Sequence, residues 1–282
     1  MIKSNGKRIL YQGAWNVMDK KIVFFDIDGT LYDLANGIPV PESTRAAISG
    51  MQKNGHLAVL CTGRTISELE PELCEIRFDG IISGCGTYIE YREKELFYET
   101  VDNEIFRRVV ESSRAHHALP FLEGRYHVYF DPAGEDAEAR QISRDYETLV
   151  AERVRPIRGQ EWEASKVTIQ LRKGRMGEKE QLMREIAADL DVIDHGHALE
   201  CVPRGFSKAS GIAFLIEQLG IKRENTYAFG DSANDKEMLA FVEYGIAMGN
   251  SSEEILSISR YRTDCLTEDG IYNACRRFGL IG

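Results

Sequence analysis

The sequence predicts an α/β fold built on a doubly wound parallel sheet, with a second, α+β domain inserted into it. Strand-like and helix-like segments alternate over most of the 282 residues, and several strand-like runs are continuously apolar, as parallel strands covered on both faces are. The middle of the chain differs, because its strand-like runs alternate between apolar and polar residues. At this length and 43% hydrophobic composition, the chain is long for one compact unit, so we expect a core with a large insertion.

The expected core is Rossmann-like and takes residues 18–84 and 203–282. Its first part should contain strands at Lys21–Phe25, Leu57–Cys61 and Gly80–Ile82 and a helix at Pro41–Asn54. Its second part should contain helices at 210–219, 235–242, 252–259 and 270–278 and strands at 226–229 and 244–248. Met18 directly precedes the first strand, so residues 1–17 are expected to be an N-terminal extension.

The expected insertion is a cap domain at residues 85–202, which is richer in charge and holds five of the six histidines. Its strands should lie at 88–91, 95–101, 125–130, 166–171 and 198–202, and its helices at 103–116, 135–150 and 177–190. An insertion leaves and re-enters the core at one sheet edge, beside the strand ends where a ligand site is expected, so it is placed to cover that site. We therefore expect residues of the insertion, among them Arg125, Tyr126 and His127, to decide which ligand is accepted.

Charge and cysteine usage exclude several classes of partner. A formal net charge of -10 and a pI near 5.2 disfavour nucleic acid and anionic membranes. The six cysteines occur singly, which is typical of buried thiols in a reducing compartment. No apolar run is long enough for a bilayer, and the N-terminus lacks a secretory signal, so we expect a cytoplasmic protein. The oligomeric state stays open.

Polar residues follow three of the apolar runs. The first run leads into Asp26-Ile27-Asp28-Gly29-Thr30, the second into Thr62-Gly63-Arg64, and the third into residues 230–235, which include Asp231 and Asp235. Ligands of open parallel sheets bind at the carboxyl ends of the strands, so these residues should meet there. Crowded carboxylates need a cation, and an oxygen-only cluster suits Mg²⁺ better than Zn²⁺. Glycine-rich turns add backbone N–H groups that bind anions, which points to a phosphate ligand.

Four motifs resemble those of the haloacid dehalogenase (HAD) superfamily of phosphotransferases. DIDGT (26–30) is similar to its first motif, DxDxT, and LCTGR (60–64) to its second. GFSKASGI (205–212), with Lys208, resembles the third, and GDSANDKEML (230–239) the fourth. The stretch between the second and third motifs has the length of a type IIB cap in the Cof-type sugar-phosphatase-like group, and TEDGI (267–271) is similar to that group's C-terminal ending.

The resemblance implies a role for each motif residue. Asp26 would be the nucleophile and a metal ligand, and Asp28 would be the general acid and base, with its main-chain carbonyl on the metal. Asp231 would be the second side-chain ligand of Mg²⁺, and Asp235 would support it. The phosphate-binding residues would be Ile27, Thr62, Gly63, Lys208 and Asn234.

The predicted function is a Mg²⁺-dependent phosphatase that hydrolyses small phosphate monoesters, such as sugar phosphates, through an aspartyl-phosphate intermediate. The alternatives are a phosphomutase, a flavin or pyridoxal phosphate phosphatase, and a non-catalytic binding protein on the same fold. Arg64 is open between contacting the substrate and fixing the cap. We interpret Gly84-Cys85-Gly86 and His195-Gly196-His197 as turns, and Arg153, Arg155 and Arg158 as a solvated edge.

Overall fold

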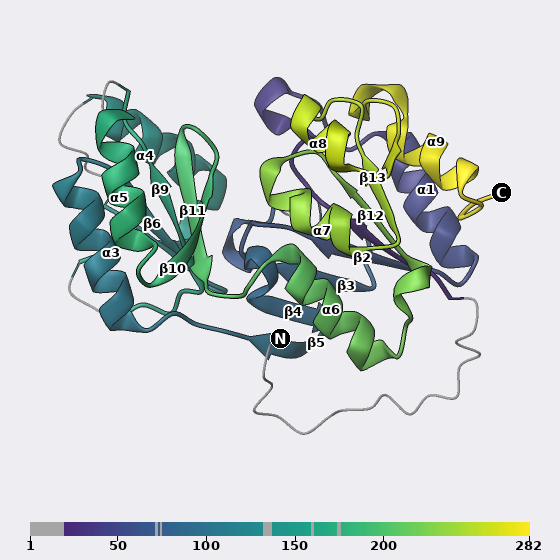
Figure 1. The fold of residues 1–282 in the computed structure, drawn as a ribbon, viewed down its shortest axis with the longest axis horizontal. Helices are drawn as coiled ribbons and strands as arrows, with labels where there is room; N and C mark the ends of the chain where they lie inside the picture. The colour runs from purple at the N-terminus through teal and green to yellow at the C-terminus, as the bar shows by residue number, and fades with distance from the viewer. Residues whose placement is uncertain (1–19, 71–72, 74, 132–136, 159–160, 174–175) are drawn as a thin grey trace. The chain divides into compact units, whose positions relative to one another are not determined.

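The structure, a computed structural model, describes residues 20–282 apart from 71–72, 74, 132–136, 159–160 and 174–175 (Figure 1). The predicted extension at 1–17 lies outside the described residues. The fold divides into two compact units. Unit 1 contains the described residues up to Gly63 together with Glu75–Phe97 and Ser207–Gly282, and unit 2 contains those of Arg64–Cys74 and Tyr98–Phe206.

Unit 1 is built on an eight-stranded sheet in the order β14-β13-β12-β1-β2-β3-β4-β5. The strands from β14 to β3 run parallel, and β4 pairs antiparallel with β3. In chain order they are β1 (Ile22–Phe25), β2 (Leu57–Cys61), β3 (Gly80–Ser83), β4 (Tyr88–Tyr91), β5 (Lys94–Tyr98), β12 (Thr226–Gly230), β13 (Tyr244–Ala247) and β14 (Tyr261–Arg262). The predicted parallel core is therefore confirmed.

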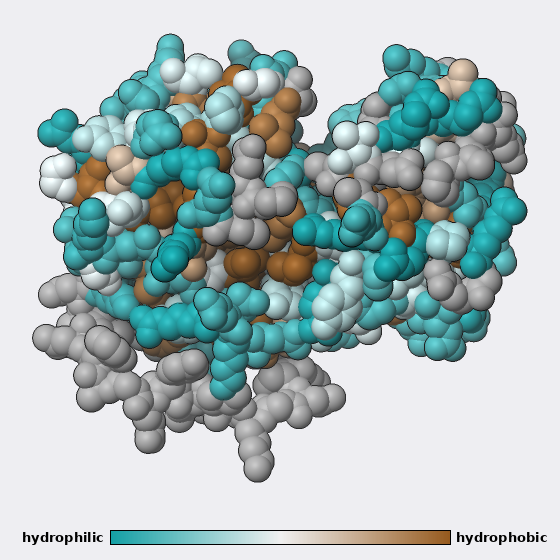
Figure 2. All heavy atoms as spheres, turned by 180° about the vertical axis from the view of Figure 1, so that it is seen from behind, coloured by the Kyte–Doolittle hydropathy of each residue, from teal (hydrophilic) through white to brown (hydrophobic). Residues whose placement is uncertain are grey.

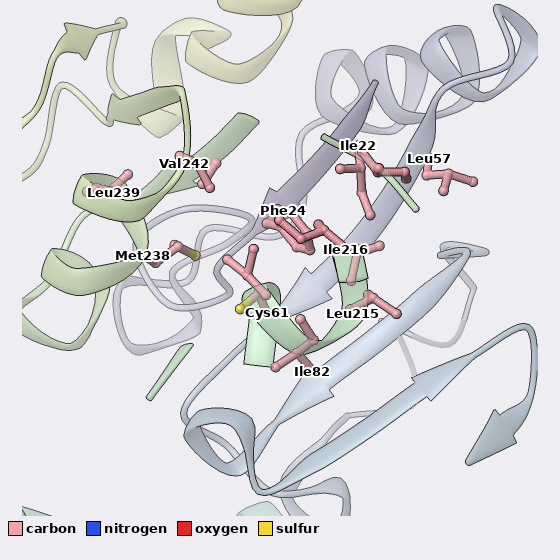
Figure 3. Close-up of a cluster of buried hydrophobic side chains, with 14 of the residues drawn as sticks. Ile22, Phe24, Leu57, Cys61, Ile82, Leu215, Ile216, Met238, Leu239 and Val242 are labelled. Carbon is pink, nitrogen blue, oxygen red and sulfur yellow. The ribbon is translucent and has the colours of Figure 1, made fainter. Parts of the chain in front are cut away.

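Helices cover both faces of this sheet, which explains why its central strands are apolar throughout. The helices are α1 (Glu42–Lys53), α6 (Lys208–Leu219), α7 (Lys236–Phe241), α8 (Glu253–Ile258) and α9 (Gly270–Arg277). On one face, Ile22 and Phe24 of β1 pack with Leu215 of α6 and Met238 of α7 (Figure 3). The alternate residues of β1 point to the other face, and α1 and α9 pack against each other. Burial on both faces fixes β1 at the centre of the unit.

Unit 2 has a six-stranded mixed sheet in the order β10-β11-β9-β6-β7-β8. Its strands are β6 (Leu119–Glu123), β7 (Val128–Tyr129), β8 (Val154–Arg155), β9 (Lys166–Gln170), β10 (Leu190–Asp194) and β11 (Ala198–Pro203). Its helices are α3 (Asn103–Ala115), α4 (Ala137–Val150) and α5 (Lys179–Ile186). Residues of α3 and α5 pack on one face of the sheet, and residues of α4 join a separate apolar cluster around Phe121 and Phe130.

The expected boundary at residue 85 differs from the structure. β4 and β5 extend the sheet of unit 1, since Tyr88–Tyr91 pairs with β3. Their half-exposed pattern reflects a place toward the sheet edge rather than a separate domain. The described residues among 64–74 in turn group with unit 2, where Arg153 donates to the carbonyls of Ser67 and Leu69 at 2.8 and 3.0 Å.

Three strands of unit 2 were not predicted: β6, β8 and β10. β6 reads LPFLE, without alternation and with a proline, and it nevertheless lies inside the sheet, between β9 and β7. β10 begins at Leu190, where the helical pattern was expected to end, and the observed helix α5 is shorter than predicted. The predicted strand at 125–130 is reduced to Val128–Tyr129. Tertiary pairing overrides local propensity at these positions.

The structure also bears on the expectations for membrane spans and for cysteines. Within the described part of the chain, no helix is long and apolar enough to cross a membrane. Of the five cysteines in that part, four are buried and none forms a disulfide.

A buried ion cluster stabilises the sheet of unit 2. The Nζ atom of Lys166 lies 2.9 Å from Glu123 Oε2 and 2.8 Å from Glu200 Oε1, and all three residues are at most 5% exposed. Burial alone would raise the pKa of Glu200, but the charge of Lys166 and a hydrogen bond with His195 outweigh it and hold that pKa well below its usual value. Glu200 therefore adds stability that is present above its unfolded pKa and is lost as the pH falls through its folded pKa.

We expect Lys166→Met to destabilise unit 2 by about 3–5 kcal/mol, because it leaves two buried carboxylates without their cation. Urea unfolding at pH 7, followed by tryptophan fluorescence, measures the change. Arg108→Gln is the control, since it breaks a half-exposed pair with Asp189 in the same unit and should cost no more than about 1 kcal/mol. Equal losses in both variants would contradict this account.

Candidate active site

Asp26 directly follows β1, the central strand of unit 1, and is 4% exposed. β1 lies between β12 and β2, with Phe25 beside Phe229 and Leu60, and the backbone N–H of Asp26 donates to the Phe229 carbonyl at 3.1 Å. The three polar segments expected to meet therefore follow neighbouring parallel strands at one sheet edge.

Lys208 lies between the first and fourth motifs. Its Nζ atom donates to Asp26 Oδ1 at 2.6 Å, Asp235 Oδ1 at 2.7 Å and Asn234 Oδ1 at 3.0 Å. Lys208 is the first residue of α6, whose N-terminus is capped by Ser207, and its side chain is fully buried. A lysine in this position acts as a fixed positive charge between two motifs that are about 200 residues apart.

The carboxylates of the fourth motif have different surroundings. Asp235 Oδ2 accepts the backbone N–H groups of Asp231 and Ser232 at 2.9 and 3.0 Å, so both of its oxygens have donors. Asp231 Oδ1 accepts a hydrogen bond from Thr30 Oγ1 at 3.2 Å, and Asp231 is partly buried. Asp231 is thus the better placed of the two to bind a cation, and Asp235 the better placed to hold the loop.

Gly29 allows this loop to approach Asp231 closely. It has a φ of +75°, and a Cβ atom added to it would lie 2.3 Å from Asp231 Oδ2. Any other residue would therefore push the aspartate away. The adjacent Asp28 has an exposed side chain, in contrast to Asp26.

Thr62 and Gly63 follow β2 and are both buried. The Thr62 N–H donates to the Ile82 carbonyl at 2.9 Å, and its carbonyl accepts from Cys85 at 3.1 Å, which fixes its main chain next to β3. The structure pairs Arg64 with Glu70 at 2.6 Å within unit 2. Of the two roles considered for Arg64, this contact supports fixing the cap rather than contacting the substrate.

The electrostatics of the cluster favour a cation. Burial would lower the pKa of Lys208, but the charges of Asp235 and Asp26 outweigh it and raise that pKa well above its usual value, so the lysine stays charged. Burial and the charge of Asp235 raise the pKa of Asp231 to about 7. With all three carboxylates ionised, they and the one ammonium carry a net charge of −2. One divalent cation would neutralise this charge and would favour the ionised form of Asp231.

The donor set fits a hard divalent cation. Asp26, Asp231 and Asp235 each supply a carboxylate oxygen, and these oxygens lie within 4.8 Å of one another. An all-oxygen set of this kind suits Mg²⁺.

A family model for haloacid dehalogenase-like hydrolases matches residues 23–275, which include most of unit 1 and all of unit 2. The chain belongs to the haloacid dehalogenase-like hydrolases. The resemblance inferred from the four motifs is confirmed, and the residues matched extend well beyond them.

Similar sequences bear the names of phosphatases. "Putative phosphatase YkrA" of Bacillus subtilis (strain 168) is 30% identical over 269 residues, which cover 94% of this chain and all of YkrA. The HMP-PP phosphatase of Serratia proteamaculans (strain 568) is 27% identical, covering 84% of this chain and 87% of that protein. With the family, these relatives confirm the prediction of a phosphatase-type enzyme.

Solved structures of the superfamily share the fold. BT1666 from Bacteroides thetaiotaomicron, described as a phosphatase of the superfamily, aligns with a TM-score of 0.78 at 26% identity, over 93% of this chain and 96% of its own. The subclass IIB sugar phosphatase BT4131 aligns with a TM-score of 0.81 at 24% identity, over 93% of this chain and all of its own. The second likeness concerns the fold alone.

Asn250 was missed by the sequence analysis of this haloacid dehalogenase-like hydrolase. Its Nδ2 donates to the carbonyl of Gly29 at 2.7 Å, and its Oδ1 accepts the N–H of Leu266 at 3.0 Å. It thus joins the first motif to the segment before α9. In the sequence, Asn250 follows the predicted strand at 244–248 after one glycine. Glycine and asparagine are common in turns, so this position looks like an ordinary loop.

The turn at Gly84–Gly86 also contributes to the site. A Cβ atom on Gly86, whose φ is +91°, would lie 2.5 Å from the Ser207 carbonyl oxygen, and one on Gly211 would lie 2.6 Å from Ile82. These two glycines let the N-terminal turn of α6 pack closely on the turn after β3. The close packing fixes the start of the helix that carries Lys208.

Proposed function

We propose that the chain is a Mg²⁺-dependent phosphatase that hydrolyses small phosphate monoesters through an aspartyl phosphate on Asp26. The observation that carries the proposal is the contact of Lys208 with both Asp26 and Asp235, beside a third carboxylate, Asp231. Lys208 supplies only one positive charge to three carboxylates. The cluster therefore needs a divalent cation before it can bind a negatively charged phosphoryl group.

We assign the metal to Asp26, the Asp28 carbonyl and Asp231. Asp235 is assigned a supporting role, because its oxygens already accept from Lys208 and from two backbone N–H groups. Mg²⁺, when bound, would supply positive charge to the phosphoryl oxygens.

The reaction follows from the carboxylates. An oxygen of Asp26 attacks phosphorus and forms an O–P bond, while the bond from phosphorus to the leaving oxygen breaks. Asp28, with its exposed side chain, gives that oxygen a proton. Water then gives a proton to Asp28 and attacks the phosphorus of the acyl phosphate. The bond from phosphorus to the Asp26 oxygen breaks, which releases inorganic phosphate and restores the Asp26 carboxylate.

Phosphoryl binding is assigned to Ile27, Thr62, Gly63 and Asn234, together with Lys208. Asn234 Oδ1 accepts from Lys208 and from Ser232 Oγ, both at 3.0 Å, so its Nδ2 is the donor that we assign to the phosphoryl oxygens. The first three residues follow β1 and β2, which are adjacent strands.

The substrate class is proposed as a small phosphorylated metabolite, with sugar phosphates first. Two relatives support this class by their names, an HMP-PP phosphatase and the 5-amino-6-(5-phospho-D-ribitylamino)uracil phosphatase YitU. The test is phosphate release from a panel of phosphorylated sugars, flavin mononucleotide and pyridoxal phosphate. Transfer to a sugar acceptor instead of water would indicate a phosphomutase, and no release from any ester would favour a binding protein.

We expect EDTA to abolish activity and Mg²⁺ to restore it, because the carboxylates would repel a phosphate ester without a cation. Ca²⁺ should inhibit, since its longer bonds and larger coordination shell would misplace Asp26. The measurement is phosphate release against free metal concentration. Full activity in chelator, or a requirement that only Zn²⁺ meets, would refute the metal assignment.

We expect Asn250→Asp to lower kcat by roughly 10- to 100-fold, because a small displacement of the first motif is costly. The aspartate retains the acceptor for Leu266 but places a carboxylate oxygen against the carbonyl of Gly29. The Mg²⁺ concentration for half-maximal activity should rise while KM changes little. The matched control is Asn273→Asp, whose amide donates to Asp264 on the surface. Similar kinetics in the two variants would contradict the positioning role.

A further inference from the structure

A cavity of about 250 Å³ lies entirely within unit 2, and its lining residues fall between Arg114 and Arg172. None of the residues assigned to the chemistry belongs to it. Five parts of the unit form its wall: the end of α3 and the turn after it, β6 and the residues after β7, helix α4, the segment after β8, and Arg172 after β9.

The inner wall of the cavity is apolar and rigid. Phe121 and Phe130 are each 1% exposed, with ring centroids 4.9 Å apart, and Ala139 of α4 is also 1% exposed. Aromatic side chains make favourable stacked or edge-on contacts with a ligand ring, and these two rings line the inner wall of the cavity with little of their surface open to solvent. At the right of Figure 2, the described part of unit 2 is covered mainly by hydrophilic side chains. The apolar inner wall of the cavity differs from this surface.

The mouth of the cavity is cationic. Arg114 Nη2 and Arg158 Nε lie 3.0 and 3.1 Å from the same oxygen of Asp131, so two guanidinium groups share one carboxylate. Arg172 also lines the cavity but lies 3.9 Å from Glu138, so the positive excess at the mouth comes from Arg114 and Arg158, which share one carboxylate. This excess is notable in a chain with a formal net charge of -10. Arg158 is 80% exposed, as expected for a solvated edge, and it shares Asp131 with a second arginine.

We propose that this cavity binds a small organic anion whose aromatic or other flat apolar body packs on Phe121 and Phe130. Its carboxylate or phosphate would accept hydrogen bonds from Arg114 and Arg158, which bind planar anions through paired N–H donors. Asp131 orients the two guanidinium groups and neutralises only one of their charges. The site shares no residue with the proposed phosphatase centre, and the proposal does not depend on that centre.

The test uses 2-naphthoate, a flat aromatic carboxylate, titrated calorimetrically into the full chain with Mg²⁺ and orthovanadate present to occupy the phosphatase centre. We expect saturable binding of one equivalent. Arg114→Gln and Arg158→Gln should each weaken it roughly tenfold, which is the loss typical of one charged hydrogen bond. Ala139→Leu should abolish it by filling the cavity, and 2-naphthamide should bind more weakly than the acid. Repeating the titration with 2-naphthylphosphonate shows whether a carboxylate or a phosphate-like group is preferred.

Arg108→Gln is the matched control, because Arg108 is also on α3 and also pairs with an aspartate, but does not line the cavity. Its affinity should equal that of the unaltered chain. The absence of saturable binding, or equal affinity in Arg114→Gln, Arg158→Gln and Arg108→Gln, would overturn the proposal. The arginine variants decide the question even if Ala139→Leu fails to fold, since the side chains of Arg114 and Arg158 are 47% and 80% exposed.

Discussion

Asp26→Asn should lose at least roughly 10⁴-fold in kcat, which is the scale of loss when a covalent nucleophile is removed. The substitution removes the carboxylate that acts as nucleophile and its negative charge, while the Oδ1 atom of an asparagine can still accept the hydrogen bond that Lys208 donates at 2.6 Å. Phosphate release under saturating substrate and Mg²⁺ measures the change. Thermal unfolding should show that the fold is retained, since the buried site keeps its shape.

The control for this variant is Asp264→Asn, which alters a surface carboxylate of unit 1 that accepts from Asn273. Its kcat should stay close to that of the unaltered chain. Normal turnover in a folded Asp26→Asn protein would remove Asp26 from the mechanism. The fold and the phosphatase family would then stand, but another nucleophile would have to be found.

Lys208→Met should lower kcat by roughly 10²–10³-fold or more, because it deletes a preorganised positive charge beside the reacting group. It should also destabilise the metal-free protein, since Asp26 and Asp235 are 4% and 0% exposed and lose their shared cation. Mg²⁺ should restore part of that stability, because a cation replaces some of the missing charge, but it should not restore kcat.

Lys236→Met provides the comparison, since Lys236 lies in the adjacent helix α7 and makes an exposed pair with Glu254. Neither its kcat nor its Mg²⁺-dependent melting temperature should move appreciably. Kinetics and melting with and without Mg²⁺ give both readouts. A Lys208→Met protein that turns over normally once Mg²⁺ has stabilised it would show that the lysine serves the fold alone.

The core of unit 1 and its cluster could be predicted because each strand end is marked twice. An uninterrupted apolar run such as Ile22–Phe25 marks a strand buried on both faces, and the polar residues after it mark the ligand-binding edge. Parallel pairing of the strands then places Asp26 and Asp231 close together, independently of the conformation of the connecting loops. The contact of Lys208 with Asp26 and Asp235 needed the fold, because α6 follows unit 2 in the chain.

The pattern was less informative where long-range pairing decides the structure. β6 contains Pro120, so its sequence gives a weak strand signal, yet it lies inside the sheet of unit 2. The half-exposed strand β4 reads like those of unit 2 but pairs with β3. The link from Asn250 to Gly29 spans 221 residues, and no local spacing marks it.

The most direct test of the account is chemical trapping of the intermediate during steady turnover. The enzyme is quenched in acid with its substrate and Mg²⁺, reduced with borohydride, digested and examined by mass spectrometry. An acyl phosphate on Asp26 predicts homoserine at position 26 in the turning-over sample and its absence when substrate is omitted. Reduction at another carboxylate, or phosphate release with no modified residue at any quench time, would contradict covalent catalysis by Asp26.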